Sequence, residues 1–332
     1  MAVIAIDLGG TKLAGAVVRA DGKIVYRNVL PLERRAGNEV GALIRGKINF
    51  LLDLAASRRI RISAIGVGVP GIVDPKSGNI WAPNIRGWES YPLRSELERE
   101  LRKPRPRRSR QGLPRLSPTR IEIESDRACY IVGETWRGAS KGCQNAIFVA
   151  VGTGIGVGIL ADGRVLRGTD GIAGAAGWLA LDRPFRREYL KCGCFEFNAS
   201  GEGLARFARD LLHGNSEDAK ASLLGASKDF SSREIFAAYE WRDPIARAVL
   251  SQAIQYWGMA TANLISLFNP EKVIFGGGVF GPARRFIPEI RARAKKWAQP
   301  ISMKRVKIEA SKLGADAGLY GAAYLALNVR QQ

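Results

Sequence analysis

Apolar residues at the start of the chain fall in short runs separated by turn-forming residues. Ala2–Ile6, Leu13–Val18 and the pair Ile24 and Val25 are three such runs, and an Asp-Gly turn lies before the third. Because Asp-Gly is a strong hairpin signal, this pattern predicts three strands joined by tight turns. Glu39–Ala56 instead carries apolar residues along one stripe at helical spacing, which predicts an amphipathic helix.

The succession of strand, glycine turn and strand returns in the middle of the chain. Ala146–Leu160 is an apolar stretch that is interrupted by the turn Gly152-Thr153-Gly154. This repetition of one supersecondary unit predicts two similar lobes. Farther on, the short strand expected at Val273–Phe275 runs into a third glycine turn, Gly276-Gly277-Gly278.

Two predicted helices begin with clear capping signals. Ser125 is a candidate N-cap for a helix over Asp126–Trp136, which follows a predicted strand at Ile121–Ile123. The pair Asp243-Pro244 opens a longer predicted helix that continues to Phe268, because proline is favoured at the first helical position. Both helices are expected to start at these residues.

One segment differs in composition from the rest of the chain. Residues 103–120 contain four prolines and only two apolar residues, Leu113 and Leu116. Such a segment cannot bury a core, and we expect a basic, mobile loop at residues 103–119. Eight of the chain's net +20 charges fall between residues 102 and 120. Because no basic stripe with interleaved aromatic residues is present, the charge indicates a solvated surface and no nucleic-acid partner.

The remaining composition is that of a soluble globular protein. Hydrophobic residues make up 46% of the chain and charged residues 25%. No apolar run approaches the length of a membrane span, and Asp7 interrupts the stretch in which a signal peptide would continue. We therefore expect a cytoplasmic protein with four reduced cysteines and no membrane partner.

The first glycine turn also suggests chemistry. Its two glycines, Gly9 and Gly10, would let the backbone approach a ligand closely, and the turn's N–H groups and the Thr11 hydroxyl can face phosphate oxygens. Asp7, at the end of the preceding strand, could hold Mg²⁺ through water. Two glycines alone are more often a plain tight turn than a phosphate-binding loop. Further turns of this kind in a defined order are needed to favour phosphate binding.

Such an order is present, and it resembles the ROK (repressor, ORF, kinase) family of sugar kinases. The matching motifs are DLGGTK at 7–12, VPGIVD at 69–74, APN at 82–84, Asp126 at a helix start, GTGIGVG at 152–158, GCFE at 193–196, ASG at 199–201, GGGV at 276–279 and LGADAGLYGAA at 313–323. The resemblance implies an α/β protein with a two-lobed, actin-like or ribonuclease-H-like ATPase fold and a cleft between the lobes. We expect a small lobe at residues 1–120 and a large lobe at 121–311, with the C-terminal helix at 312–332 packing back on the first.

The resemblance also implies roles for individual residues and a glucokinase-like activity. It implies a homodimer that uses ATP and Mg²⁺ to phosphorylate a hexose, with Asp126 as the catalytic base. The phosphates of ATP would contact Gly9, Gly10, Thr11 and Lys12 and also Gly152, Thr153 and Gly154, while adenosine would lie against Gly276, Gly277 and Gly278. The sugar would contact Gly71, Asn84, Asp126 and Glu196. The one histidine, His213, lies outside every motif, so a histidine-based mechanism is not expected.

The chain departs from the family pattern on the sugar side. At the positions of the family's E-x-G-H sequence it has Ala175 and Trp178 in place of the glutamate and the histidine. In the zinc-binding run, Arg187 and Tyr189 replace two cysteines and only Cys194 is retained, so we expect no structural zinc. An alternative function is therefore a non-catalytic regulator that binds a sugar or a nucleotide. A DNA-binding repressor is disfavoured, because the first glycine turn begins at residue 7 and leaves no room for a preceding helix-turn-helix.

Overall fold

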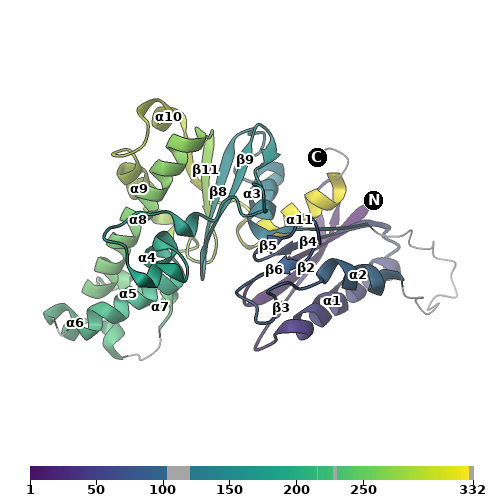
Figure 1. Ribbon diagram of the computed structural model, residues 1–332, viewed down its shortest axis with the longest axis horizontal. Helices are drawn as coiled ribbons and strands as arrows, with labels where there is room; N and C mark the ends of the chain where they lie inside the picture. The colour runs from purple at the N-terminus through teal and green to yellow at the C-terminus, as the bar shows by residue number, and fades with distance from the viewer. Residues whose placement is uncertain (103–119, 215, 227–229, 329–332) are drawn as a thin grey trace. The chain divides into compact units, whose positions relative to one another are not determined.

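The computed structural model describes residues 1–102, 120–214, 216–226 and 230–328. The basic loop expected at residues 103–119 lies outside these residues. The chain divides into two compact units, of which the first comprises Met1–Gly142, Arg164–Ala173 and Asp316–Gln332. The second comprises Cys143–Gly163 and Gly174–Ala315. Figure 1 shows the elements of both units along the chain.

The first unit is built on a five-stranded sheet. The strands have the order β3-β2-β1-β4-β7, and their bounds are β1 (Ala2–Leu8), β2 (Lys12–Arg19), β3 (Ile24–Pro31), β4 (Ile62–Val69) and β7 (Arg120–Ser125). β1 and β2 pair antiparallel with Leu8 opposite Leu13, so the first glycine turn joins two paired strands. The predicted meander is therefore confirmed. β4 runs parallel to both β1 and β7.

Helices cover both faces of this sheet (Figure 1). α1 (Gly37–Ser57) packs on β1 and β2, while α3 (Asp126–Arg137) and α11 (Ala317–Asn328) pack on each other, with α11 on β1 and β4. Side chains alternate along β1, so Ile4, Ile6 and Leu8 join the core on the α1 side. Asp7 consequently faces α11.

The first unit also contains a short helix and a two-stranded hairpin. α2 (Leu93–Arg102) contacts α1 and β7, and β5 (Ile72–Val73) pairs with β6 (Ile80–Trp81) in a two-stranded hairpin. α11 approaches the sheet closely at Gly66, where a Cβ would overlap the carbonyl oxygen of Ala322. The absence of a side chain at Gly66 allows this approach. The small residues of the LGADAGLYGAA motif thus allow helix and sheet to lie nearly in backbone contact.

The second unit contains a separate sheet and most of the helices. Its longer strands have the order β9-β8-β11-β12, with bounds β8 (Ala146–Val151), β9 (Ile155–Ala161), β11 (Lys272–Gly276) and β12 (Lys307–Ala310). The hairpin of β8 and β9 repeats the opening of β1 and β2, as the repeated sequence pattern predicts. The two-residue strand β10 (Arg164–Val165) follows β9 in the chain, and its residues belong to the first unit. A large hydrophobic core fills this unit.

The helices of the second unit differ greatly in length. The longest, α8 (Pro244–Phe268), begins with Asp243 as its N-cap and Pro244 as its first residue, as predicted. The other α-helices are α4 (Cys194–Ala199), α5 (Gly201–His213), α6 (Glu217–Ala221), α7 (Ser232–Glu240), α9 (Ile287–Ala294) and α10 (Pro300–Arg305). The 3₁₀ turns are η1 (Ala176–Trp178), η2 (Arg187–Leu190), η3 (Leu223–Ala226), η4 (Ala283–Phe286) and η5 (Gly314–Asp316).

The division into units differs from the boundary at residue 120 that the sequence suggested. β7 hydrogen-bonds to β4, and α3 follows it directly and packs on α11, so the first unit continues to Gly142. Among the described residues, no helix combines the length and the hydropathy that crossing a membrane requires.

Candidate functional site

Asp7 is a buried carboxylate near the end of β1. Its Oδ1 atom is buried and has no hydrogen-bond partner among the described residues. Burial, with a smaller contribution from the nearby Asp126, raises the pKa of Asp7 to about 7, and Lys12 opposes the shift. A Cβ on Gly318 would lie 2.5 Å from Asp7 Oδ1, so α11 passes directly over this carboxylate. An unpaired buried carboxylate oxygen is the kind of group that a cation or a bound water would satisfy.

Asp126 is the first residue of α3, as predicted. Ser125 caps this helix by accepting a hydrogen bond from the Ala128 N–H at 3.4 Å, which fixes where the helix begins. Burial raises the pKa of Asp126 to about 6, although the adjacent Arg127 opposes the shift. The Tyr130 hydroxyl lies one helical turn along and donates to Asp126 Oδ2 at 3.5 Å. Asp126 is therefore a carboxylate that gains or loses a proton near neutral pH.

The first glycine turn leaves its backbone exposed. The Gly9 N–H donates to the Lys12 carbonyl at 2.9 Å, and this bond closes the turn between β1 and β2. Gly10, Thr11 and Lys12 are exposed, and no atom lies within 4 Å of a Cβ placed on Gly10. The turn can therefore accept an anionic ligand at its open N–H groups. It directly follows Asp7 in sequence, so both features lie at one end of β1.

Arg127 joins two loops of the first unit. Its guanidinium donates to the carbonyl of Gly71 at 3.4 Å and to the carbonyls of Gly171, Ile172 and Ala173 at 3.3 to 3.4 Å. Gly71 has a φ of +129°, and a Cβ there would overlap the carbonyl of Trp81, so only glycine fits this position. Arg127 was missed as a candidate, although its place beside Asp126 was a usable signal.

Asn84 lies in a compact turn of the same unit. The Ala82 N–H donates to the Trp88 carbonyl at 2.8 Å, and the indole of Trp88 stacks on Tyr91 with ring centroids 4.4 Å apart. Trp88 is fully buried, whereas Asn84 is exposed. The buried indole thus fixes a turn that presents the Asn84 side chain to solvent.

Glu196 lies against the second glycine turn, within the second unit. It belongs to the first turn of α4, and its Oε2 atom accepts a hydrogen bond from the Ile155 N–H at 2.6 Å. Burial raises the pKa of Glu196, while this hydrogen bond opposes the shift. The turn itself is closed by the Gly152 N–H, which donates to the Gly154 carbonyl at 2.9 Å. The structure therefore brings together a predicted sugar contact and a predicted phosphate turn.

The third glycine turn follows β11 and crosses the end of β8. Gly277 has a φ of +89°, and the Val279 N–H donates to the Val151 carbonyl at 3.0 Å. Gly276, Gly277 and Gly278 thus lie beside the strand that leads into Gly152-Thr153-Gly154. Within the second unit, the structure places the two predicted nucleotide turns next to each other.

The family's zinc run has poor metal ligands in this chain. Trp178 offers no metal-binding atom, Arg187 is cationic, and the Tyr189 hydroxyl is hydrogen-bonded to Asp182 Oδ2 at 3.2 Å. No group of three or more His, Cys, Asp or Glu residues with metal-site geometry occurs in the part of the chain that the structure describes. The donor set does not fit a tetrahedral zinc ion. The unpaired Oδ1 of Asp7, in contrast, fits a hard cation bound through water.

Comparisons with known proteins agree with the family resemblance. The family model "ROK family" matches residues 3–329. A glucokinase from Halalkalibacterium halodurans is 30% identical, covering 99% of this chain and 95% of that protein. A xylose repressor from Caldicellulosiruptor bescii is 28% identical over 96% of this chain and 76% of its own length.

A solved structure gives the same relationship in three dimensions. The crystal structure of a ROK family glucokinase from Streptomyces griseus, in complex with glucose and AMPPNP, matches with a TM-score of 0.76 and 29% identity over the full length of both chains. The fold is accordingly the two-lobed, actin-like fold that the motifs predicted. Since the family model spans nearly the whole chain, this protein belongs to the ROK family.

Proposed function

We propose that this protein is an ATP-dependent sugar kinase that transfers the γ-phosphoryl group of ATP to a hydroxyl of glucose or a related hexose. The observation that carries the proposal is Asp126, a carboxylate at the first position of α3 whose pKa is raised to about 6. A general base works best when its pKa lies near the operating pH. The similarity to glucokinases over nearly the full chain supports the same activity.

In this proposal Asp126 accepts the proton of the attacking sugar hydroxyl. The hydroxyl oxygen then forms the new bond to the γ-phosphorus as the bond to the leaving ADP oxygen breaks. The Ser125 cap and the Tyr130 hydroxyl restrain the position of the carboxylate. Arg127 would hold Gly71, a predicted sugar contact, beside the residue that receives the proton.

The glycine turns would bind the nucleotide through their backbone. The open N–H groups and the Thr11 hydroxyl of the first turn, with Lys12, suit phosphate oxygens, and so do the N–H groups around Thr153. Gly276, Gly277 and Gly278 would lie against adenosine, as the family resemblance implies. Asp7 would hold Mg²⁺ through water, and the ion would supply neutralisation of the phosphate charge. A cation here would also relieve the burial of the unpaired Asp7 carboxylate.

Sugar recognition rests on fewer side chains than the family pattern provides. Asn84 and Glu196 remain available for sugar hydroxyls, whereas Ala175 and Trp178 cannot replace the glutamate and histidine of the E-x-G-H sequence. A homodimer and a cytoplasmic location are further parts of the proposal, and both rest on the sequence and the family resemblance.

The test is a coupled assay of ADP release with a panel of hexoses and amino sugars. The proposal predicts that ADP is released only when Mg²⁺ and one of the sugars are both present, and that neither of them is sufficient alone. Because Ala175 and Trp178 remove two sugar contacts, a second candidate is a regulator that binds sugar or nucleotide without turnover. The similarity to a xylose repressor supports this candidate. ATP binding measured by calorimetry, without turnover on any sugar, would favour it over the kinase.

A further inference from the structure

Tyr189 takes the place of a metal ligand in the family pattern, and here it is an internal structural residue. It lies in η2 and is only 3% exposed. Its ring packs edge-to-face against Phe197 of α4, with centroids 5.2 Å apart, and similarly against Phe185 at 6.1 Å. The side chain therefore fills a closed, mainly aromatic position at the point where the family pattern has a thiolate ligand.

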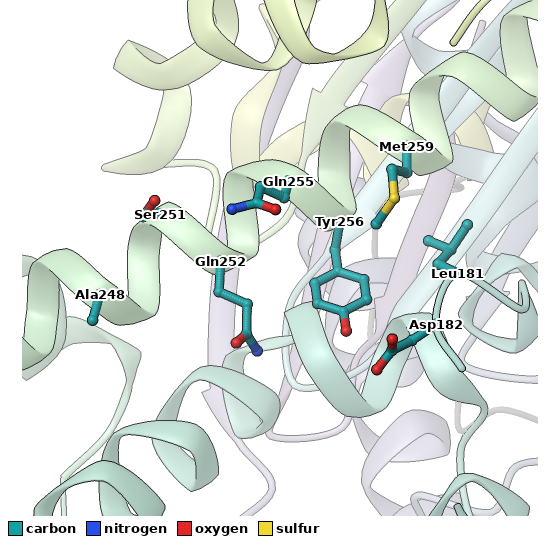
Figure 2. Close-up of a pocket in the computed structure, with 8 residues that line it drawn as sticks. All are labelled: Leu181, Asp182, Ala248, Ser251, Gln252, Gln255, Tyr256 and Met259. Carbon is teal, nitrogen blue, oxygen red and sulfur yellow. The ribbon is translucent and has the colours of Figure 1, made fainter. Parts of the chain in front are cut away.

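The hydroxyl of Tyr189 links three parts of the second unit. It donates to Asp182 Oδ2 at 3.2 Å and accepts from Asn198 Nδ2 at 3.4 Å. Asp182 also accepts a hydrogen bond from Tyr256 of α8, and Figure 2 shows the Tyr256 hydroxyl directed toward the Asp182 carboxylate. Both side chains line a surface pocket of about 440 Å³, so solvent reaches this side of the cluster. Tyr189 thus connects α8 to α4 through one carboxylate.

Asn198 carries this restraint into α4. Its Nδ2 atom also donates to the carbonyl of Cys194 at 2.9 Å, which is the first residue of the helix. The Tyr189 carbonyl accepts from the Gly193 N–H at 2.8 Å, immediately before the helix. Gly193 has a φ of +86°, and a Cβ there would lie 2.5 Å from the Cα of Trp178, so no other residue fits without displacing that segment. Both ends of α4 are therefore fixed from the Tyr189 side.

The position of α4 determines which backbone groups the Glu196 carboxylate can contact. Glu196 lies midway between Cys194 and Asn198, and its carboxylate accepts the Ile155 N–H at 2.6 Å beside the second glycine turn. A Cβ on Gly154 would lie 2.6 Å from Glu196 Oε2, so the carboxylate is in close contact with this turn. A rotation or shift of α4 would break that hydrogen bond.

We propose that Tyr189, with Asp182 and Asn198, performs without metal the anchoring that zinc provides in the family pattern, and is a positioning residue for Glu196. The importance of this anchoring for sugar binding rests on the proposed kinase function, whereas the anchoring itself does not. In this chain, a hydrogen-bonded aromatic cluster then takes the structural place that the metal ion has in the family pattern.

The experiment measures hydrogen exchange of the Ile155 amide by NMR in the whole protein. Tyr189→Phe removes the hydroxyl and keeps the ring, and Tyr189→Leu removes both while keeping apolar volume. Losing one hydrogen bond corresponds to about fivefold faster exchange. Tyr189→Phe loses the two hydrogen bonds of the hydroxyl, so we expect at least about fivefold faster exchange in this variant and more in Tyr189→Leu. Glu196→Ala, which removes the acceptor, sets the upper limit. The Ile159 amide in the same strand should be unaffected.

Tyr239→Phe is the matched control. Tyr239 packs on Phe286 in the same unit, and the substitution also removes one tyrosine hydroxyl while keeping the ring. It should leave Ile155 exchange unchanged. The Michaelis constant for the sugar should rise in Tyr189→Leu while kcat changes less. Unchanged Ile155 exchange in a folded Tyr189→Leu protein, or equal acceleration in Tyr239→Phe, would overturn the inference. Absence of turnover in the wild-type protein would overturn the kinase proposal and leave the exchange result standing.

Discussion

Replacing Asp126 with asparagine should separate catalysis from stability. Asparagine has nearly the shape of aspartate but cannot take up the proton of a sugar hydroxyl. If Asp126 is the general base, kcat should fall by roughly 10²- to 10⁴-fold, the range for a positioned base. The affinity for ATP should hardly change, because the expected phosphate contacts are the glycine turns.

The same substitution should make the protein more stable at neutral pH. The pKa of Asp126 is raised from 3.8 to about 6 by burial, so the folded state holds this proton more tightly than the unfolded state does. The contribution of Asp126 to the free energy of unfolding is therefore greatest below pH 3.8, and it decreases as the pH rises toward 6. A difference of about 2 pKa units corresponds to ~3 kcal/mol, and partial solvation of Asp126 reduces this to ~1–2 kcal/mol. A fully solvated carboxylate would give a smaller change.

The assay is urea unfolding of Asp126→Asn and wild-type protein at pH 4 and at pH 7.5, paired with turnover and ATP calorimetry. The gain in stability should appear at pH 7.5 and nearly vanish at pH 4. Glu98→Gln is the control, because the Glu98 side chain is 44% exposed on α2 and lies 4.0 Å from the Arg102 guanidinium, a distance at the outer limit of an ion pair. Near-native turnover in Asp126→Asn would refute the catalytic assignment. A variant that is less stable than wild type at pH 7.5 would refute the reasoning from burial.

Four further results are expected. In the wild-type protein kcat/KM should increase as the pH rises through about 6, since Asp126 must lose its proton, and a flat profile between pH 5 and 7 would contradict this. Gly318→Ala should destabilise the protein by ~1–3 kcal/mol in thermal unfolding, because the new methyl group meets Asp7, whereas Gly10→Ala should change stability by less than about 0.5 kcal/mol. His213→Ala should leave kcat unchanged, and a large loss would implicate this histidine in catalysis. Purified protein should contain no stoichiometric zinc by elemental analysis, and chelators should not lower its melting temperature.

Local signals in the sequence predicted the elements that carry the site. Ser125 and Asp243 each cap a helix where the capping rules placed them, and the first meander forms between β1 and β3. Boundaries were less accurate, since β3 extends to Pro31 although only Ile24 and Val25 gave an apolar signal. The later residues of β3 are mixed polar and apolar and only partly buried, so their strand pairing comes from β2 and not from their own pattern.

Contacts between distant segments could not be predicted in this way. The raised pKa of Asp7 depends on burial, with Asp126 and Asp316 as further causes, and Gly318 packs over the carboxylate from more than 300 positions later in the chain. The four carbonyls around Arg127 come from two loops that no periodicity connects. Such contacts arise from tertiary packing, which single-residue patterns do not encode.

The central claim is phosphoryl transfer from ATP to a hexose, and product analysis tests it most directly. Wild-type protein with MgATP and glucose, or with another hexose of the panel, is followed by ³¹P NMR. The account predicts a sugar-phosphate resonance that grows together with that of ADP. In Asp126→Asn this resonance should grow at least ~10²-fold more slowly. ADP and inorganic phosphate without any sugar phosphate, or no reaction with any hexose while ATP binds, would contradict it.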